Sequence, residues 1–137
     1  MEQKEDELFC VGQKAFIGRD GQVLVLNDPI EGLDFPGGKI QQGETGFSES
    51  LKREVREETG LEIEVGEPFT VWYNEFRDPR HRNYGKKVYL VGFRCRYVSG
   101  EIKLSDEHDK YHWVSRDSYK EVYENSDFFR ALEKYWS

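Results

Sequence analysis

Two short stretches of the sequence, Gly38-Lys-Ile-Gln-Gln-Gly-Glu44 and Arg53-Glu-Val-Arg-Glu-Glu-Thr-Gly-Leu61, decide how this chain is interpreted. The second stretch predicts the C-terminal half of a helix over residues 48–59. Ser48 is a suitable N-cap for that helix, and Gly60 is a suitable residue just beyond its C-terminal end. The glycines of the first stretch indicate a turn in which the backbone can approach other groups closely.

The predicted helix carries three glutamates on one face. Glu54, Glu57 and Glu58 occupy positions i, i+3 and i+4, so their side chains fall within about 100° of arc, where like charges repel. They also lie near the C-terminal end of the helix, where the helix dipole favours cations. One interpretation is a solvated surface helix, in which Arg53 and Arg56 offset part of the charge. The other is a site for Mg²⁺, which takes oxygen ligands from a few carboxylates, waters and substrate phosphates.

Together, the two stretches resemble the sequence box of the Nudix hydrolases. That box runs Gly, five residues, Glu, seven residues, Arg-Glu, an aliphatic residue, any residue, Glu-Glu, any residue, Gly and an aliphatic residue. One spacing differs here, because eight residues (45–52) separate Glu44 from Arg53. We expect the extra residue to lie in the turn before the helix, since Gly46 tolerates unusual dihedral angles, and not as a bulge within it. All nine defined positions of the box are present: Gly38, Glu44, Arg53, Glu54, Val55, Glu57, Glu58, Gly60 and Leu61.

The resemblance implies a Mg²⁺-dependent enzyme, with Mn²⁺ as a substitute ion. It implies that Arg53 orients a carboxylate and that Glu54, or else Glu107, serves as the base for water. Glu107 lies in an acidic segment, 105–109, for which a solvated surface loop is the alternative interpretation. The expected catalytic residues are Arg53, Glu54, Glu57 and Glu107, and the expected metal ligands are the Gly37 carbonyl, Glu54, Glu57, Glu58 and Glu107.

The segment before the box, Leu33-Asp-Phe-Pro-Gly-Gly-Lys39, is similar to the same region of the MutT-like branch, which cleaves 8-oxo-dGTP and related nucleoside triphosphates. Phe35 is expected either to stack on a base or to be a core residue.

The basic segment 77–87 could form a lid over phosphates or a solvated loop. The three histidines show no metal-site spacing, so we expect them at the surface. The expected substrate-binding residues are Phe35, Gly38, Lys39, Glu44, Arg77 and Arg80.

The order of the remaining elements predicts the fold class. We expect strands over residues 8–18, 23–26, 33–36, 61–73, 88–98 and 111–114, and a final helix capped by Ser126. Arg19-Asp-Gly-Gln22 is a hairpin signal. This order of strands and helices predicts an α/β (α+β) fold. The resemblance implies an α/β/α sandwich with a central mixed β-sheet. Residues 1–6 are expected to form a flexible tail and residues 7–137 a single domain.

Composition excludes several classes of protein. The net charge of −7 opposes a broad duplex DNA interface. No apolar run is long enough to cross a membrane, and the acidic N-terminus does not resemble a signal peptide. Two distant cysteines, Cys10 and Cys95, indicate neither a disulfide framework nor a zinc site. We therefore expect a cytoplasmic protein, either a monomer or a homodimer, that acts on a small nucleotide.

The resemblance implies hydrolysis of a phosphoanhydride in a nucleoside diphosphate linked to another group. A nucleoside triphosphate, cleaved to the monophosphate and pyrophosphate, is the first expectation. The alternatives are an ADP-ribose or nucleotide-sugar pyrophosphatase, a dinucleoside polyphosphate hydrolase and an RNA 5′-end pyrophosphohydrolase. A non-catalytic nucleotide-binding module is a different class; the extra residue favours it, and the complete set of carboxylates opposes it.

Overall fold

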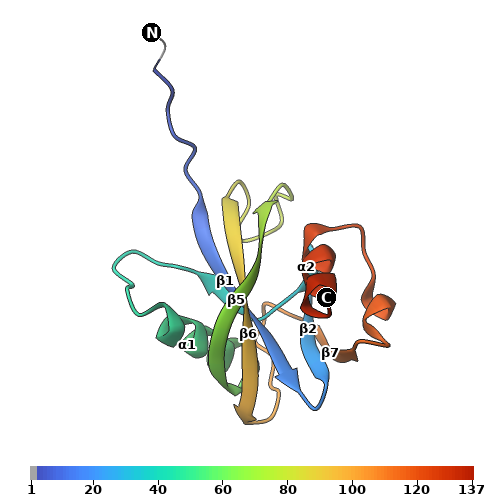
Figure 1. Ribbon diagram of the computed structural model, residues 1–137. Helices are drawn as coiled ribbons and strands as arrows, with labels where there is room; N and C mark the ends of the chain where they lie inside the picture. Colours follow the sequence, from blue (N-terminus) through green and yellow to red (C-terminus); the bar gives the residue numbers. More distant parts are fainter. Residues whose placement is uncertain (1–2) are drawn as a thin grey trace.

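The computed structural model describes residues 3–137, so Met1 and Glu2 of the expected tail lie outside the described residues. Residues 3–9 have no regular secondary structure, and Figure 1 shows this segment projecting away from the sheet. No helix in residues 3–137 has both the length and the apolar character needed to cross a membrane. The elements in chain order are β1 (Cys10–Arg19), β2 (Gln22–Asp28), β3 (Gly32–Asp34), β4 (Gly37–Lys39), α1 (Phe47–Thr59), β5 (Glu62–Glu75), β6 (Lys87–Ser99), β7 (Lys110–Ser115), the 3-10 helix η1 (Tyr119–Val122) and α2 (Asp127–Tyr135).

The strands form a mixed sheet, as expected. The order β3-β2-β1-β6-β5 describes its main path, with β4 also pairing with β1 and β7 with β2. The pairing of β1 with β6 is parallel, whereas the other pairings are antiparallel. The predicted hairpin is confirmed: Asp20 and Gly21, with φ of 51° and 77°, join β1 to β2 as a two-residue turn. Positive φ at both residues is the type I′ geometry that matches the twist of the strands.

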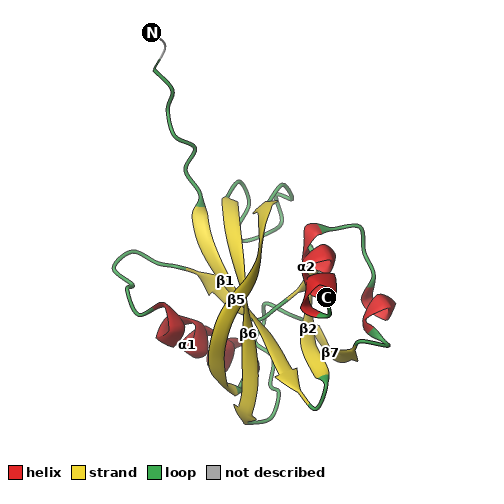
Figure 2. Ribbon diagram, viewed as in Figure 1, coloured by secondary structure: helices red, strands yellow, loops and turns green. Residues whose placement is uncertain are grey.

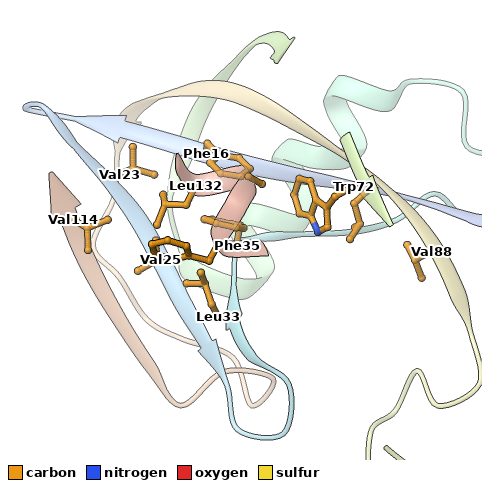
Figure 3. Close-up of a cluster of buried hydrophobic side chains, with 12 residues drawn as sticks. Phe16, Val23, Val25, Leu33, Phe35, Trp72, Val88, Val114 and Leu132 are labelled. Carbon is orange, nitrogen blue, oxygen red and sulfur yellow. The ribbon is translucent and has the colours of Figure 1, made fainter. Parts of the chain in front are cut away.

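Helices cover both faces of the sheet, which gives the expected sandwich (Figures 1 and 2). Side chains alternate across each strand, so β2 contributes Leu24 and Leu26 to the core under α1, and Val23 and Val25 to the core under α2. This explains why its apolar run is continuous. Figure 3 shows the second of these cores, in which Leu132 of α2 packs with residues of several strands.

Phe35 belongs to this second core. Its side chain is fully buried, its ring is stacked on Phe16 with centroids 4.0 Å apart, and Trp72 and Phe128 also contact it. The expectation that Phe35 could stack on a nucleobase is therefore wrong for this structure, and the alternative, a core role, is correct (Figure 3).

Helix α1 is continuous from Phe47 to Thr59 and ends at Gly60, which adopts a left-handed conformation with φ of 79°. The expected N-cap at Ser48 is wrong: Gly46 occupies that position and makes no side-chain capping bond. The helix starts earlier because Ser50 N–H already donates to the Gly46 carbonyl at 2.9 Å. The extra residue of the box therefore lies before the helix, and the spacing of the three glutamates is regular.

Candidate active site

A cavity of about 180 Å³ lies beside the C-terminal half of α1. Glu54, Glu57 and Glu58 all line it, so the shared helix face predicted from their spacing is turned toward one space. Glu107, from the segment before β7, lines the same space. Because ligand pockets usually measure about 300 to 1,000 Å³, this cavity is smaller than a typical site for a whole small-molecule ligand. The other lining residues are Gly12, Lys14, Gly37, Gly38, Lys39, Gln41, Phe76, Arg82, Asn83, Val88 and Leu90.

The two glycines of β4 bring the backbone close to the glutamates. Gly37 N–H donates to Glu58 Oε2 at 2.9 Å. A Cβ on Gly38 would lie 1.4 Å from Glu54 Oε2, so no side chain fits there while that carboxylate keeps its place. Gly37 has a φ of 149°, and a Cβ there would lie 1.9 Å from the backbone oxygen of Gln13 on β1. Only glycine satisfies both the dihedral angle and the strand packing at this position.

The helix carboxylates are held in an environment that disfavours their negative charge. Burial raises the pKa of Glu54, and the nearby Arg53 only partly opposes this effect. Burial also raises the pKa of Glu58 to about 8, although Lys14 lowers it in part and the Asp34 carboxylate raises it further. Carboxylates that are desolvated and close to one another gain from a bound cation.

Arg53 connects the glutamates of the box. Its guanidinium lies 3.1 Å from Glu44, 3.6 Å from Glu54 and 3.4 Å from Glu57. Glu44 also accepts hydrogen bonds from the Gln41 backbone N–H at 2.7 Å and from Ser50 Oγ at 2.7 Å. It does not line the cavity. Glu44 therefore stabilises the turn before α1 and holds Arg53 in place. It does not lie where the sequence led us to expect a substrate-binding residue.

A buried chain of polar groups runs behind the cavity. Lys14 Nζ lies 3.0 Å from Asp34 Oδ1, and His108 Nε2 lies 2.9 Å from Asp34 Oδ2. Burial alone would raise the pKa of Asp34, but attraction from Lys14 and the hydrogen bond with His108 outweigh burial and hold that pKa well below its usual range. Burial alone would lower the pKa of Lys14, but Asp34 and Glu58 raise it. The expected surface position of His108 is therefore wrong, because its side chain is buried.

Replacing Lys14 with Met should destabilise the protein strongly. The substitution preserves most of the side-chain volume but leaves the buried Asp34 carboxylate without its cationic partner, while the hydrogen bonds from His108 and the Phe35 backbone N–H remain. Breaking one side of a buried ion pair costs about 3 to 5 kcal/mol. The free energy of unfolding, measured in urea, should fall by this amount, and a loss below about 1 kcal/mol would contradict the ion pair. The double variant Lys14→Met, Asp34→Asn should recover part of the loss, because the uncompensated charge is gone.

The basic loop between β5 and β6 is anchored by a second buried histidine. His81 Nε2 lies 2.8 Å from Asp28 Oδ2, and His81 Nδ1 accepts from the Asn83 backbone N–H at 3.0 Å. His81 is buried, so its expected surface position is also wrong. This anchor directs Asn83 and Arg82 into the cavity, where Asn83 Oδ1 accepts from Lys39 Nζ at 2.7 Å and Arg82 lies 3.2 Å from Glu107.

The two arginines expected to bind substrate lie elsewhere on this loop. Arg77 pairs with Glu75, and Arg80 makes hydrogen bonds to Asp78 at 2.8 and 3.1 Å. Both arginine side chains are largely exposed, and neither lines the cavity. The arginine of this loop that lines the cavity is therefore Arg82, and not Arg77 or Arg80 as expected.

The family model described as the NUDIX domain matches residues 14–132. The chain belongs to the Nudix hydrolase family. The ADP-ribose pyrophosphatase of Methanocaldococcus jannaschii is 34% identical over 102 residues, which cover 72% of this Nudix chain but only 57% of that relative. The nucleoside triphosphatase NudI of Escherichia coli is 36% identical over 112 residues, covering 72% of this chain and 76% of NudI. The crystal structure of the MutT protein from Methanosarcina mazei Go1 has a TM-score of 0.74 at 28% identity, covering 98% of this chain and 99% of that one.

Nudix hydrolases use a divalent metal, and the cavity of this Nudix domain fits one. Its donors are carboxylate oxygens, which bind both Mg²⁺ and Mn²⁺. The backbone at Gly38 leaves open the space beside Glu54 that a Cβ would fill. Side-chain atoms of Glu58, Glu107 and His108 that could act as ligands lie within 4.8 Å of one another.

Lys14 and Arg82 line the cavity of this Nudix chain but were not among the site residues expected from the sequence. The sequence does contain an indication of the role of Lys14. It is a single charged residue beside the apolar residues Ala15, Phe16 and Ile17, and a charged side chain next to buried apolar residues needs a partner of opposite charge. Arg82 left no such signal, because it is one of several cations in the basic segment 77–87.

Proposed function

We propose that this protein catalyses the Mg²⁺-dependent hydrolysis of a phosphoanhydride in a nucleoside triphosphate, releasing the monophosphate and pyrophosphate. The observation that carries the proposal is the cavity itself, where three carboxylates of one helix face a space that Lys39 and Arg82 also line. A polyphosphate–metal complex carries charges of both signs, and this lining offers partners for each.

The proposed metal ligands are the Gly37 carbonyl, Glu54, Glu57, Glu58 and Glu107. When bound, the ion would neutralise polyphosphate charge and lower the pKa of a coordinated water. The ligands come from β4, α1 and the segment before β7. They would therefore be brought together only in the folded domain.

Glu54 is the proposed base. A water oxygen forms a bond to phosphorus while the bond from phosphorus to the bridging oxygen breaks, and the proton of that water passes to the Glu54 carboxylate. The Glu54 side chain lines the cavity next to Gly38, which places its carboxylate where it can accept that proton. Arg53 holds Glu54 and Glu57 in place as a positioning residue. Lys39 and Arg82 would bind the charged phosphates, including the leaving pyrophosphate.

A nucleoside triphosphate substrate is supported by the likeness to NudI, since the match covers most of that protein. Hydrolysis of ADP-ribose is the second candidate, because the relative from Methanocaldococcus jannaschii carries that name. In that case the same carboxylates and the same base would act, and the group beyond the second phosphate would be a sugar.

A substrate panel with product identification tests the proposal. The panel should contain the canonical nucleoside triphosphates, 8-oxo-dGTP, ADP-ribose and a dinucleoside polyphosphate, each with and without Mg²⁺. Monophosphate plus pyrophosphate supports the triphosphate reaction, whereas AMP plus ribose 5-phosphate supports the second candidate. No Mg²⁺-stimulated turnover on any member, with nucleotide binding retained in calorimetry, would indicate a non-catalytic binding module.

A further inference from the structure

We propose that His108 supplies a nitrogen ligand to a divalent ion held with Glu58 and Glu107, and that this site binds Mn²⁺ or Co²⁺ in preference to Mg²⁺. The proposal rests on the metal site of the proposed function and adds to it a ligand of a different chemical type. It concerns one face of the cavity, where α1 meets the segment before β7.

The three side chains are close enough to share an ion. Their potential ligand atoms all lie within 4.8 Å of one another, and Glu58 Oε1 lies 3.8 Å from His108 Nδ1. Two ligands at about 2.1 Å from a common ion are at most about 4.2 Å apart. The Glu58–His108 pair already satisfies this limit. Glu107 is exposed and paired with Arg82, so its carboxylate would have to turn from that partner toward the other two ligands.

His108 has an unused nitrogen at this point. Its side chain is completely buried, and Nδ1 has no hydrogen-bond partner among the described residues. A buried polar atom left without a partner costs about 1 to 3 kcal/mol, so its presence needs an explanation. An ion between His108 and Glu58 supplies that partner.

The surrounding hydrogen bonds prepare this nitrogen to bind a metal. His108 Nε2–H donates to Asp34 Oδ2 at 2.9 Å, and Asp34 is held in turn by Lys14. Histidines that bind metals typically donate their other ring N–H to a carboxylate in this way, which leaves the lone pair of the free nitrogen for the ion. Glu58 is oriented similarly: Oε2 accepts from Gly37 N–H, and Oε1 is the oxygen nearest His108.

The type of ligand determines the type of ion. Imidazole suits transition metals, whereas Mg²⁺ favours oxygen ligands and keeps several waters. Two carboxylates and one imidazole should therefore bind Mn²⁺ or Co²⁺ more tightly than three carboxylates would, with little gain for Mg²⁺. The competing arrangement is a doubly protonated His108 paired with both Asp34 and Glu58, which leaves no nitrogen free for a metal.

Pulsed electron paramagnetic resonance of the full-length protein with bound Mn²⁺ separates these arrangements. We expect modulation from a directly coordinated ¹⁴N in the wild-type protein. His108→Gln should abolish that modulation and weaken Mn²⁺ binding about tenfold or more, while changing Mg²⁺ affinity less than about threefold. The matched control is His112→Gln, since His112 is exposed on β7 and its replacement should leave both readouts unchanged.

The outcomes distinguish this inference from the proposed function. Stoichiometric Mn²⁺ binding without ¹⁴N modulation overturns the role of His108 but leaves the carboxylate site intact. Failure of the wild-type protein to bind either Mn²⁺ or Mg²⁺ overturns both proposals. If His108→Gln does not fold, the wild-type spectrum alone still decides, because the nitrogen coupling requires no variant.

Discussion

Replacing Glu54 with Gln should lower turnover by about 10²- to 10⁴-fold, the usual contribution of a general base. The amide keeps the shape of the side chain beside Gly38 but cannot take the proton of the attacking water. Folding stability should be unchanged or slightly higher, because the change removes a half-buried charge that lies near Glu44 and Glu57. Steady-state turnover at saturating Mg²⁺ and a urea melt of the same sample measure the two effects.

Glu49→Gln is the matched control for this experiment. Glu49 is in the first turn of the same helix, its side chain is exposed, and it does not line the cavity. The same chemical change there should leave turnover within about twofold of wild type. Near-normal turnover in the Glu54 variant would show that another group, with Glu107 the next candidate, accepts the proton.

Replacing either of the adjacent glycines of β4 with alanine should have two different effects, a loss of folding stability for Gly37 and a loss of turnover for Gly38. Gly37→Ala should destabilise the fold by about 3 to 5 kcal/mol, because φ of 149° is strained for alanine and the new Cβ would lie 1.9 Å from the Gln13 backbone oxygen. Gly38→Ala should fold with a loss of about 1 kcal/mol or less, because the three atoms nearest its Cβ would all belong to the Glu54 side chain. That carboxylate must move, so turnover should fall about 10²-fold or more.

Urea unfolding and turnover should be measured on both variants, because together they separate the loss of folding stability from the loss of turnover. A stable and active Gly37→Ala protein would contradict the close packing of β4 against β1. A Gly38→Ala protein with normal turnover would contradict the position of Glu54 and, with it, the proposed base. The pair is informative because the two residues are neighbours and undergo the same substitution.

The features that local sequence determines were predictable. The Asp20–Gly21 hairpin follows from a turn that needs two positive φ angles. The continuous apolar run of β2 follows from burial on both faces, and the shared face of Glu54, Glu57 and Glu58 follows from helical geometry. Helix α1 has its predicted end because Gly60 stops it, whereas its start was misplaced by one residue because the backbone of Gly46, and no side chain, caps it.

The partners of the buried charged groups were not predictable. His108 meets Asp34 across a sequence separation of 74 residues, and His81 meets Asp28 across 53. Neither pairing produces a recognisable pattern in the sequence, because the periodicity of a helix or strand relates only residues that are a few positions apart. Phe35 shows the same limit: a base platform and a core residue require the same side chain, and only its contacts with Phe16 and Trp72 decide between them.

The parallel pairing of β1 with β6 has a consequence for the order in which the molecule can assemble. Cys10 is aligned with Val88 and Gly18 with Arg96, so this central pairing closes a loop of 78 residues (88 − 10 and 96 − 18). Such distant pairing slows folding, because the entropy of loop closure is lost before the contacts are gained. On the ribosome, the first 60 residues carry the glycines of β4 and every glutamate of α1, yet β1 has no parallel neighbour until β6 emerges. The nascent chain therefore carries its acidic helix beside an incomplete sheet until β6 has been made, and the cavity can close only after the later segment with Glu107 and His108 has also emerged.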